Sequence, residues 1–353
     1  MKMKMHYEAR ISVAFKLNIF FTGVTGYIGG SVLSRLLKHK DAASFHITAL
    51  VRSTDKAEKL KTLGVNTIIG SYSNEDLTFL KEAASKADVV ITAVDCDNLP
   101  PAQAILDGLK LKYEASSKAP ILIHTSGTGI LVDDARGLAS EHIHYSDVET
   151  DKLNALPVTT PHRNVDIPIL EADKAGFIKA YVVTPSTVFG KPEGPLIELG
   201  IQNGHSMQLP WLLKASIARK QGGHIGKGLN RWPAVHVEDN ADLYLILFDA
   251  IRANPDKVPR GYYFAENFDY SYLEASTVIA ETLVELGIGT DPKPTDFTIE
   301  ESEKYLGPLW FWLGTNCYAK ADRGRALGWK PKYGKEAYLA DIKSEVKFYA
   351  QQQ

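Results

Sequence analysis

The chain has 353 residues, of which 44% are apolar, 10% aromatic and 23% charged, the composition of an ordinary globular protein and not of a disordered or fibrous one. Forty lysines and arginines stand against 42 aspartates and glutamates, so the net charge of -2 provides no broad basic field for nucleic acid or an anionic membrane. The two cysteines exclude a disulfide scaffold, and no segment resembles a signal peptide or a bilayer span, so we expect a cytoplasmic protein.

After an N-terminal extension, residues 1–16, strand-like and helix-like segments alternate through the first half of the chain. Strands are predicted at residues 17–22, 45–51, 65–69, 88–94, 121–125 and 177–183. Helices are predicted at residues 28–38, 55–63, 75–86 and 101–117. A further helix begins at Thr160–Pro161 and either kinks at Pro168 or restarts with Asp166 as its cap. Parallel neighbours need crossovers, so this alternation predicts an α/β fold with a doubly wound parallel sheet, a Rossmann domain, over residues 17–190.

The pattern changes in the second half, where glycine and proline interrupt residues 190–228. Beyond them we predict strands at residues 235–237 and 262–264 and helices at residues 239–251, 271–286, 299–306 and 336–350. Residues 191–353 are therefore expected to form mainly a smaller, substrate-binding C-terminal lobe, from which residues 229–265 return to the core.

A glycine-rich loop follows the first predicted strand and opens the first predicted helix, the context that a dinucleotide site requires. Gly23 permits the tight turn, Gly26 lets the backbone approach a pyrophosphate, and Gly29 allows close packing of helix on strand. The amides at the start of the helix would face the phosphate oxygens. We predict that the loop binds a dinucleotide through Gly23, Thr25, Gly26, Tyr27, Ile28 and Gly29.

The residues after the second predicted strand indicate which dinucleotide is bound. NAD-binding proteins usually place an acidic residue here, whereas this chain has Arg52, followed by Ser53 and, one turn on, Lys56. A guanidinium pairs with a 2′-phosphate through two hydrogen bonds. The sequence therefore favours NADP(H), and the nearby Asp55 keeps NAD(H) possible.

The glycine loop resembles the TGxxGxxG motif of the short-chain dehydrogenase/reductase superfamily, in its extended or atypical branch. Later segments resemble that branch in the same order: His124–Gly127, Thr184–Gly190 (TPSTVFG), Trp232–Asp239 (WPAVHVED) and Leu327–Pro331 (LGWKP). The resemblance implies an NAD(P)-binding, epimerase/dehydratase-like fold. It also implies cofactor contacts at Ala93, Val94, Asp95, Thr125, Ser126, Pro185, Thr187 and Val188.

The superfamily carries its chemistry on a Tyr-x-x-x-Lys pair in the helix after the fifth strand, and no such pair occurs between Thr125 and Tyr181. His162 stands at the tyrosine position and Asp166 at the lysine position. An imidazole titrates near neutrality, so His162 is a candidate acid/base, with Asp166 on the same helix face holding the ring.

Three alternatives remain open. Ser126 and Thr128 flank Gly127, where many epimerases have their catalytic serine, and one of them is a candidate to hold a substrate oxygen. The chain can also be a catalytically silent NADP(H)-binding redox sensor, or a non-redox isomerase or dehydratase using the same cleft. The aromatic segment at residues 309–313 (LWFWL) would be a partner surface in a sensor and a lid in an enzyme.

The preferred hypothesis is an atypical NADP(H)-dependent oxidoreductase that acts on a carbonyl or hydroxyl group of a small organic molecule, as a monomer or homodimer. We expect no metal site, because the spacing of His142, His144, Asp147 and Glu149 fits no zinc pattern.

Overall fold

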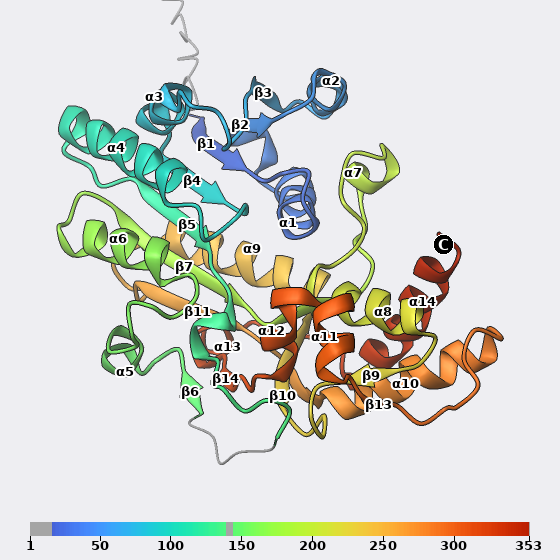
Figure 1. The fold of residues 1–353 in the computed structure, drawn as a ribbon. Helices are drawn as coiled ribbons and strands as arrows, with labels where there is room; N and C mark the ends of the chain where they lie inside the picture. Colours follow the sequence, from blue (N-terminus) through green and yellow to red (C-terminus); the bar gives the residue numbers. More distant parts are fainter. Residues whose placement is uncertain (1–15, 139–143, 353) are drawn as a thin grey trace, which may run out of the picture.

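The computed structural model describes residues 16–138 and 144–352, so most of the predicted N-terminal extension lies outside the described residues. A seven-stranded sheet forms its centre, and all six neighbouring strand pairs in it are parallel (Figure 1). In sheet order the strands are β11 (Gly261–Ala265), β7 (Lys179–Pro185), β5 (Ile121–Thr125), β4 (Val89–Thr92), β1 (Leu17–Thr22), β2 (Phe45–Val51) and β3 (Asn66–Ile69).

Helices cover both faces of this sheet, which is why its central strands are apolar and buried along most of their length. One face carries α1 (Tyr27–Leu37) and α9 (Val237–Ala253), which pack against each other. The other face carries α3 (Thr78–Lys86), α4 (Leu99–Ser116) and α6 (Arg163–Lys174), while α2 (Thr54–Thr62) connects β2 to β3. The predicted doubly wound Rossmann fold is confirmed.

The order of the strands places a crevice between β1 and β4. The chain runs outward from β1 to β2 and β3 and then crosses to β4 on the other side of β1. At such a switch point the connections leave the sheet in opposite directions, and ligands bind at the carboxyl ends of the two strands. The glycine loop follows β1, so the topology puts it at this crevice.

A smaller body stands beyond the carboxyl ends of the strands (Figure 1). Its three-stranded sheet consists of β8 (Thr187–Phe189), β10 (Arg231–His236) and β12 (Phe268–Ser271), and it carries α8 (Gln208–Arg219), α10 (Tyr272–Glu285) and α14 (Lys335–Ala350). The remaining short elements are β6 (Tyr145–Ser146), β9 (Gly223–His224), β13 (Thr295–Asp296), β14 (Ala319–Lys320), α5 (Thr150–Asn154), α7 (Pro195–Glu198), α11 (Ile299–Tyr305), α12 (Trp310–Gly314) and α13 (Asp322–Ala326).

Within residues 229–265, some segments join the larger sheet and its helices and others join the smaller sheet. β11 extends the larger sheet beside β7, and α9 packs on α1. β10 instead pairs with β8 and β12 in the smaller sheet, so β8, which lies within the predicted Rossmann range, belongs to the smaller body.

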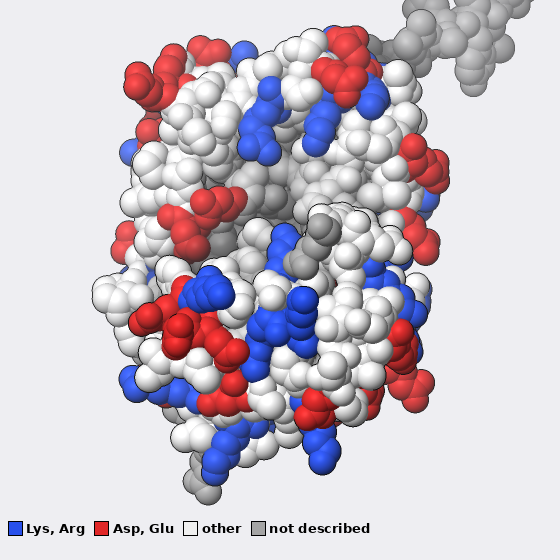
Figure 2. Space-filling model, turned by 45° about the vertical axis from the view of Figure 1, so that its right-hand side comes forward, with Lys and Arg blue, Asp and Glu red and all other residues white. Residues whose placement is uncertain are grey.

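The space-filling view shows a hollow between the two bodies, with lysine and arginine side chains gathered above and below it (Figure 2). Among the described residues, no helix combines the length and apolarity needed to cross a bilayer.

Candidate active site

The glycine loop packs so closely on β4 that side chains at two of its glycines would collide with backbone. Gly23 has a positive φ of 87°, and a Cβ there would overlap the carbonyl oxygen of Ala93. A Cβ on Gly29 would overlap the carbonyl oxygen of Gly23. At Gly26 a Cβ would meet only Gly23 O at 3.1 Å and Ala93 O at 3.9 Å within 4 Å. This is a cradle of bare backbone at the start of α1, where the first-turn amides have no partner inside the helix.

The loop residues are also tied to the smaller body. Asn203 N donates to Thr25 O at 3.0 Å, and the hydroxyl of Tyr27 donates to Gly190 O. Ile28 is half-buried in the first turn of α1. Tyr27 therefore offers its backbone, and not its hydroxyl, to a ligand of the loop.

The residues predicted to select the cofactor lie at the end of β2 and the start of α2. Arg52 is exposed directly after β2 and forms no ion pair within the described part of the chain. Ser53 caps α2, since its Oγ accepts a hydrogen bond from Lys56 N at 3.4 Å. Asp55 pairs with Lys59 at 3.3 Å. The acidic neighbour is thus engaged elsewhere, and Arg52 remains available to an anion.

The other predicted cofactor residues lie at or just after the carboxyl ends of β4, β5 and β7, except Thr187 and Val188, which lie in β8. Several of their polar groups are engaged inside the protein. Ala93 and Val94 line the glycine loop, and Asp95 Oδ1 accepts from Asp97 N at 3.0 Å. Thr125 Oγ1 lies 2.6 Å from Tyr244 OH, and Thr187 Oγ1 lies 3.1 Å from Tyr270 OH. Pro185 ends β7, and Val188 is half-buried in β8.

His162 stands immediately before α6 in a left-handed backbone conformation, with φ at 68°. The prediction that this helix begins at Thr160–Pro161 is wrong, because Arg163 is its first residue. The backbone N–H of His162 donates to Asp97 Oδ1 at 3.0 Å, which holds the residue out of the helix. A non-glycine residue at positive φ costs about 1 kcal/mol or more, a cost that is typical of functional sites.

The loop after β4 also contacts the side chain of His162 through two polar atoms. Its Nδ1 lies 2.9 Å from Asp97 Oδ1 and 3.2 Å from Cys96 Sγ. Asn164 Nδ2 donates to the carbonyl oxygen of Asp97 at 2.6 Å and so fixes the same loop. Burial favours the neutral ring, but the hydrogen bonds and charges of Asp97 and Cys96 outweigh it and raise the pKa of His162 to about 10.

The predictions that Asp166 holds the ring of His162, or caps a restarted helix, are wrong. It lies inside α6, fully buried, where its Oδ2 accepts hydrogen bonds from Ser126 Oγ at 2.8 Å and Tyr262 OH at 3.1 Å. Burial raises the pKa of Asp166 to about 6. The helix continues through Pro168, whose missing N–H interrupts only one hydrogen bond.

Ser126 and Thr128, the predicted serine–threonine cluster, make different contacts. Ser126 is held by Asp166, whereas Thr128 is buried with Oγ1 lacking a hydrogen-bond partner among the described residues. Between them, Gly127 faces His162: a Cβ there would lie 3.0 Å from His162 Nε2. The imidazole thus occupies the space that a side chain at position 127 would need.

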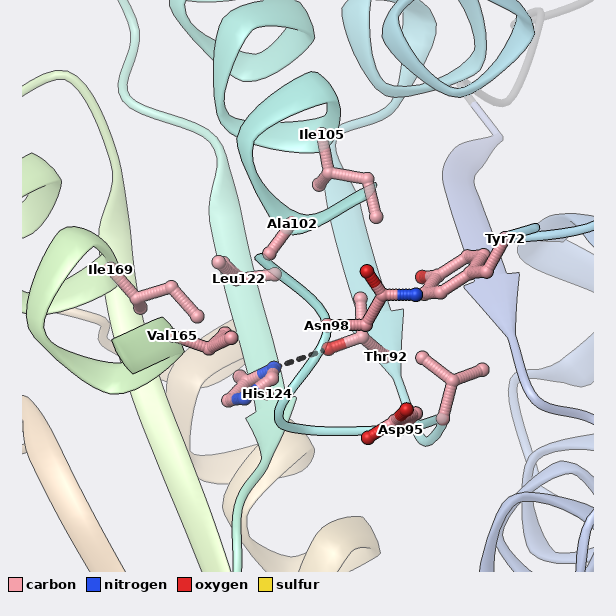
Figure 3. A pocket seen from close by; sticks show the side chains of 11 residues that line it. Tyr72, Thr92, Asp95, Asn98, Ala102, Ile105, Leu122, His124, Val165 and Ile169 are labelled. Atoms are coloured by element: carbon pink, nitrogen blue, oxygen red, sulfur yellow. Dashed lines mark hydrogen bonds between the residues drawn. The ribbon is translucent and has the colours of Figure 1, made fainter. Parts of the chain in front are cut away.

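A small cavity lies behind the site, between α4 and α6 (Figure 3). Its volume of about 10 Å³ is at the lower limit for one water molecule, so it is too small for a substrate. His124 lines it and is hydrogen-bonded through Nδ1 to Thr92 Oγ1 at 2.7 Å. Burial lowers the pKa of His124 to about 3, which keeps this ring neutral.

The aromatic segment at residues 309–313 lies over the site and does not form a free surface. The Trp312 ring stacks on His162 with centroids 6.2 Å apart and planes 19° apart. A Cβ on Gly129 would come within 2.9 Å of both His162 Nε2 and Trp312 Cζ3. Trp312 is half-buried, which favours the lid interpretation over the partner surface.

Cys96 and Asp97 were missed as site residues by the sequence analysis, which had included Trp312 only as part of the aromatic segment at residues 309–313. The only available signal for the first two was their place directly after a strand predicted to reach the cofactor crevice. Of the rejected metal candidates, His142 lies outside the described residues, and Asp147 accepts hydrogen bonds from the backbone of Phe264 and Arg323.

Comparison with known proteins agrees with this architecture. Residues 16–113, from β1 to α4, match the NmrA-like family. The oxidase ucsJ of an Acremonium species is 28% identical over 338 residues, which cover 89% of this chain and 92% of that protein. A 4-hydroxy-2-methyl-3-oxo-4-farnesyl-3,4-dihydroquinoline-1-oxide ketoreductase of Stigmatella aurantiaca is 25% identical over 203 residues, which cover 56% of this chain and 58% of that protein.

Solved structures extend the likeness over the whole fold. The UDP-glucuronic acid 4-epimerase of Bacillus cereus, solved with UDP-glucuronic acid and NAD, superposes with a TM-score of 0.61 and 16% identity over 94% of this chain and 100% of that one. The UDP-glucose 4-epimerase of Thermotoga maritima superposes with a TM-score of 0.61 and 13% identity over 95% and 99%. At these identities the likeness establishes the fold.

Proposed function

From the premise that the chain has the NAD(P)-binding, epimerase/dehydratase-like fold of the extended short-chain dehydrogenases/reductases, we propose that it is an NADP(H)-dependent oxidoreductase. It reduces a carbonyl group of a small organic molecule, or oxidises the corresponding alcohol. The observation that carries the proposal is the position of His162, held at the carboxyl edge of the same sheet that presents the glycine cradle. The oxidase and ketoreductase named above are consistent with redox chemistry on this scaffold.

The described residues fit a dinucleotide phosphate. Gly23 and Gly29 have no room for side chains, and Gly26 leaves the start of α1 bare, so backbone amides can receive a pyrophosphate. Arg52 would hold the 2′-phosphate of NADPH, which would supply the hydride. We place the protein in the cytoplasm, a reducing compartment in which Cys96 and Cys317 would remain free thiols.

His162 would donate the proton that balances hydride addition to a carbonyl. Its Nδ1 is turned toward Asp97, so Nε2 is the nitrogen that can serve a substrate oxygen. Asp97 fixes both the backbone and the ring, and the carboxylate stabilises positive charge on the imidazole. The Ser126 hydroxyl donates its one hydrogen to Asp166, so it would hold the substrate oxygen only after that hydrogen turns away from the carboxylate.

NADPH oxidation measured against a panel of ketones, aldehydes and enones tests the proposal. We expect turnover with at least one class, and a large loss of kcat in His162→Gln with NADPH affinity preserved. Tight NADPH binding without turnover on any member of the panel would instead support the cofactor-sensor alternative. Equal turnover in wild type and His162→Gln would remove His162 from the mechanism.

A further inference from the structure

Three side chains of metal-binding type converge beside the proposed catalytic nitrogen. Cys96 Sγ, Asp97 Oδ1 and His162 Nδ1 all lie within 4.8 Å of one another. They come from two segments, the loop after β4 and the residue before α6, which are 65 positions apart between Asp97 and His162. Burial decreases from the half-buried Cys96 and His162 to the exposed Asp97, so one side of the cluster is open to solvent.

The contacts of Cys96 and Asp97 with His162 fit a common metal ion better than a proton relay through the imidazole. In a nucleophile–histidine–acid relay, the nucleophile and the acid contact opposite nitrogens of the imidazole. Here Cys96 Sγ at 3.2 Å and Asp97 Oδ1 at 2.9 Å both approach the same nitrogen, Nδ1. A single N–H cannot be directed fully at both atoms, whereas a cation placed between the three atoms can bond to each.

The separations are close to those of ligands around such a cation. Zinc bonds of about 2.0 Å to nitrogen or oxygen and about 2.3 Å to sulfur imply tetrahedral ligand pairs about 3.3–3.5 Å apart. The two measured pairs, at 2.9 Å and 3.2 Å, need to widen by only about 0.3 Å. The exposed Asp97 carboxylate can adjust to complete the set.

The groups around the cluster already hold the ligands in place. The backbone N–H of His162 donates to the ligand oxygen of Asp97 at 3.0 Å, and Asn164 Nδ2 donates to the Asp97 carbonyl at 2.6 Å. Outer contacts of this kind orient metal ligands and strengthen binding. Trp312 covers the ring of His162, which limits its rotation.

We propose that Cys96, Asp97 and His162 bind a divalent transition-metal ion of the zinc class. A thiolate and an imidazole select such ions over Mg²⁺ and Ca²⁺, and three protein ligands leave a fourth position for water or another small ligand. The site is tested independently of the proposed reduction, but the two states of His162 exclude each other. The ion would take the place on Nδ1 that a proton has in the imidazolium, so the metal-bound ring would not be the proton donor of the reduction.

Cobalt titration of the full chain tests the site directly, because a thiolate bound to Co²⁺ gives a charge-transfer band in the near ultraviolet. The protein is reduced, stripped with a chelator and titrated with Co²⁺, then with Zn²⁺ as competitor. We expect a band that saturates at one ion per chain and disappears with Zn²⁺. Cys96→Ser should abolish the band, and Asp97→Asn should weaken binding at least about tenfold, since losing even an outer-contact residue costs 10–100-fold.

His46→Gln is the matched control, because His46 is an exposed histidine on β2, and it should behave as wild type. NADPH affinity, followed by fluorescence, should be unchanged in Cys96→Ser, which shows that the variant is folded and separates this proposal from the proposed function. Absence of a saturable band in folded wild-type protein would overturn the site. So would a band that persists in Cys96→Ser, or unaltered binding in Asp97→Asn.

Discussion

The glycine loop makes a prediction that separates folding from cofactor binding, because Gly26 and Gly29 differ in what an added methyl group would meet. At Gly29 the methyl would overlap Gly23 O and lie 3.2 Å from Ala93 Cβ, so the loop has to move. At Gly26 the nearest atom is Gly23 O at 3.1 Å, and φ of -78° suits any residue. Gly29→Ala should therefore disturb the fold, and Gly26→Ala should leave it nearly intact.

The expected magnitudes follow from these contacts. Overpacking costs about 1–3 kcal/mol, and overlap of the Gly29 Cβ with a backbone oxygen puts this substitution in the upper part of that range, about 2–3 kcal/mol. About 1 kcal/mol is offset because alanine favours the helix more than glycine does, so Gly29→Ala should lose about 1–2 kcal/mol of unfolding free energy. Gly26→Ala should change stability by less than about 1 kcal/mol. Its methyl group stands between the start of α1 and a pyrophosphate, and loss of two charge-assisted hydrogen bonds at about 1.5–3 kcal/mol each predicts about 10²–10⁴-fold weaker NADPH binding.

Urea unfolding measures the stability change, and a fluorescence titration measures the NADPH dissociation constant. Gly334→Ala serves as control, since a Cβ there meets nothing within 4 Å, and it should leave NADPH affinity unchanged. Wild-type affinity in folded Gly26→Ala would refute the assignment of this loop to the cofactor. Full stability in Gly29→Ala would refute the packing of the loop on β4.

Three further predictions concern selectivity, catalysis and pH. Arg52→Asp should weaken NADPH binding about tenfold or more and leave NADH binding equal or tighter, as measured by calorimetry; an unchanged preference would contradict the 2′-phosphate role. His162→Gln should lower kcat about 10²–10⁴-fold with the NADPH dissociation constant unchanged, and a parallel loss of affinity would indicate a structural role instead. Burial raises the pKa of Asp147 to about 6, so its contribution to stability is complete below about pH 4 and is lost as the pH rises through 6. In urea unfolding, the stability of wild type relative to Asp147→Asn should fall as the pH rises from about 4 through 6. A difference that does not change with pH would contradict the raised pKa of this buried carboxyl.

Local sequence signals were sufficient for the larger sheet because each signal lies within one element. The runs that became β1, β2 and β5 are short, apolar and bounded by turn residues, and the predicted limits match the structure. No strand was predicted at β8 or β12, and the predicted strand at residues 235–237 covers only the end of β10. These three strands pair across long intervals of the chain, which local signals do not report. The start of α6 was misplaced because Thr160 and Pro161 look like a cap and a first helical residue, whereas a contact with Asp97 decides where the helix begins.

In the candidate site, too, features set by neighbouring residues were predicted and contacts between distant segments were not. The glycine loop and Arg52 are recognisable from sequence because their function depends on neighbours along the chain. The orientation of His162 depends on Cys96 and Asp97, which spacing within α6 cannot reveal, and spacing instead suggested Asp166 as the partner. Asp166 has the correct helical offset but points into the core toward Ser126 and Tyr262. A shared helix face therefore did not imply a shared contact.

The departures from the superfamily motif at this site are linked by their packing. A histidine at position 162 turns its Nε2 toward residues 127 and 129, and a Cβ at either position would come within about 3 Å of that nitrogen. A side chain at position 127 would crowd the imidazole, which would have to shift by a few tenths of an ångström, and one at position 129 would also press on Trp312. Glycine at both positions therefore gives the histidine ring its room, while the nearby Ser126 hydroxyl is directed at Asp166 in the lysine position. Replacing His162 by tyrosine alone would consequently not restore the usual site, because its serine and lysine are absent from the positions that a tyrosine needs.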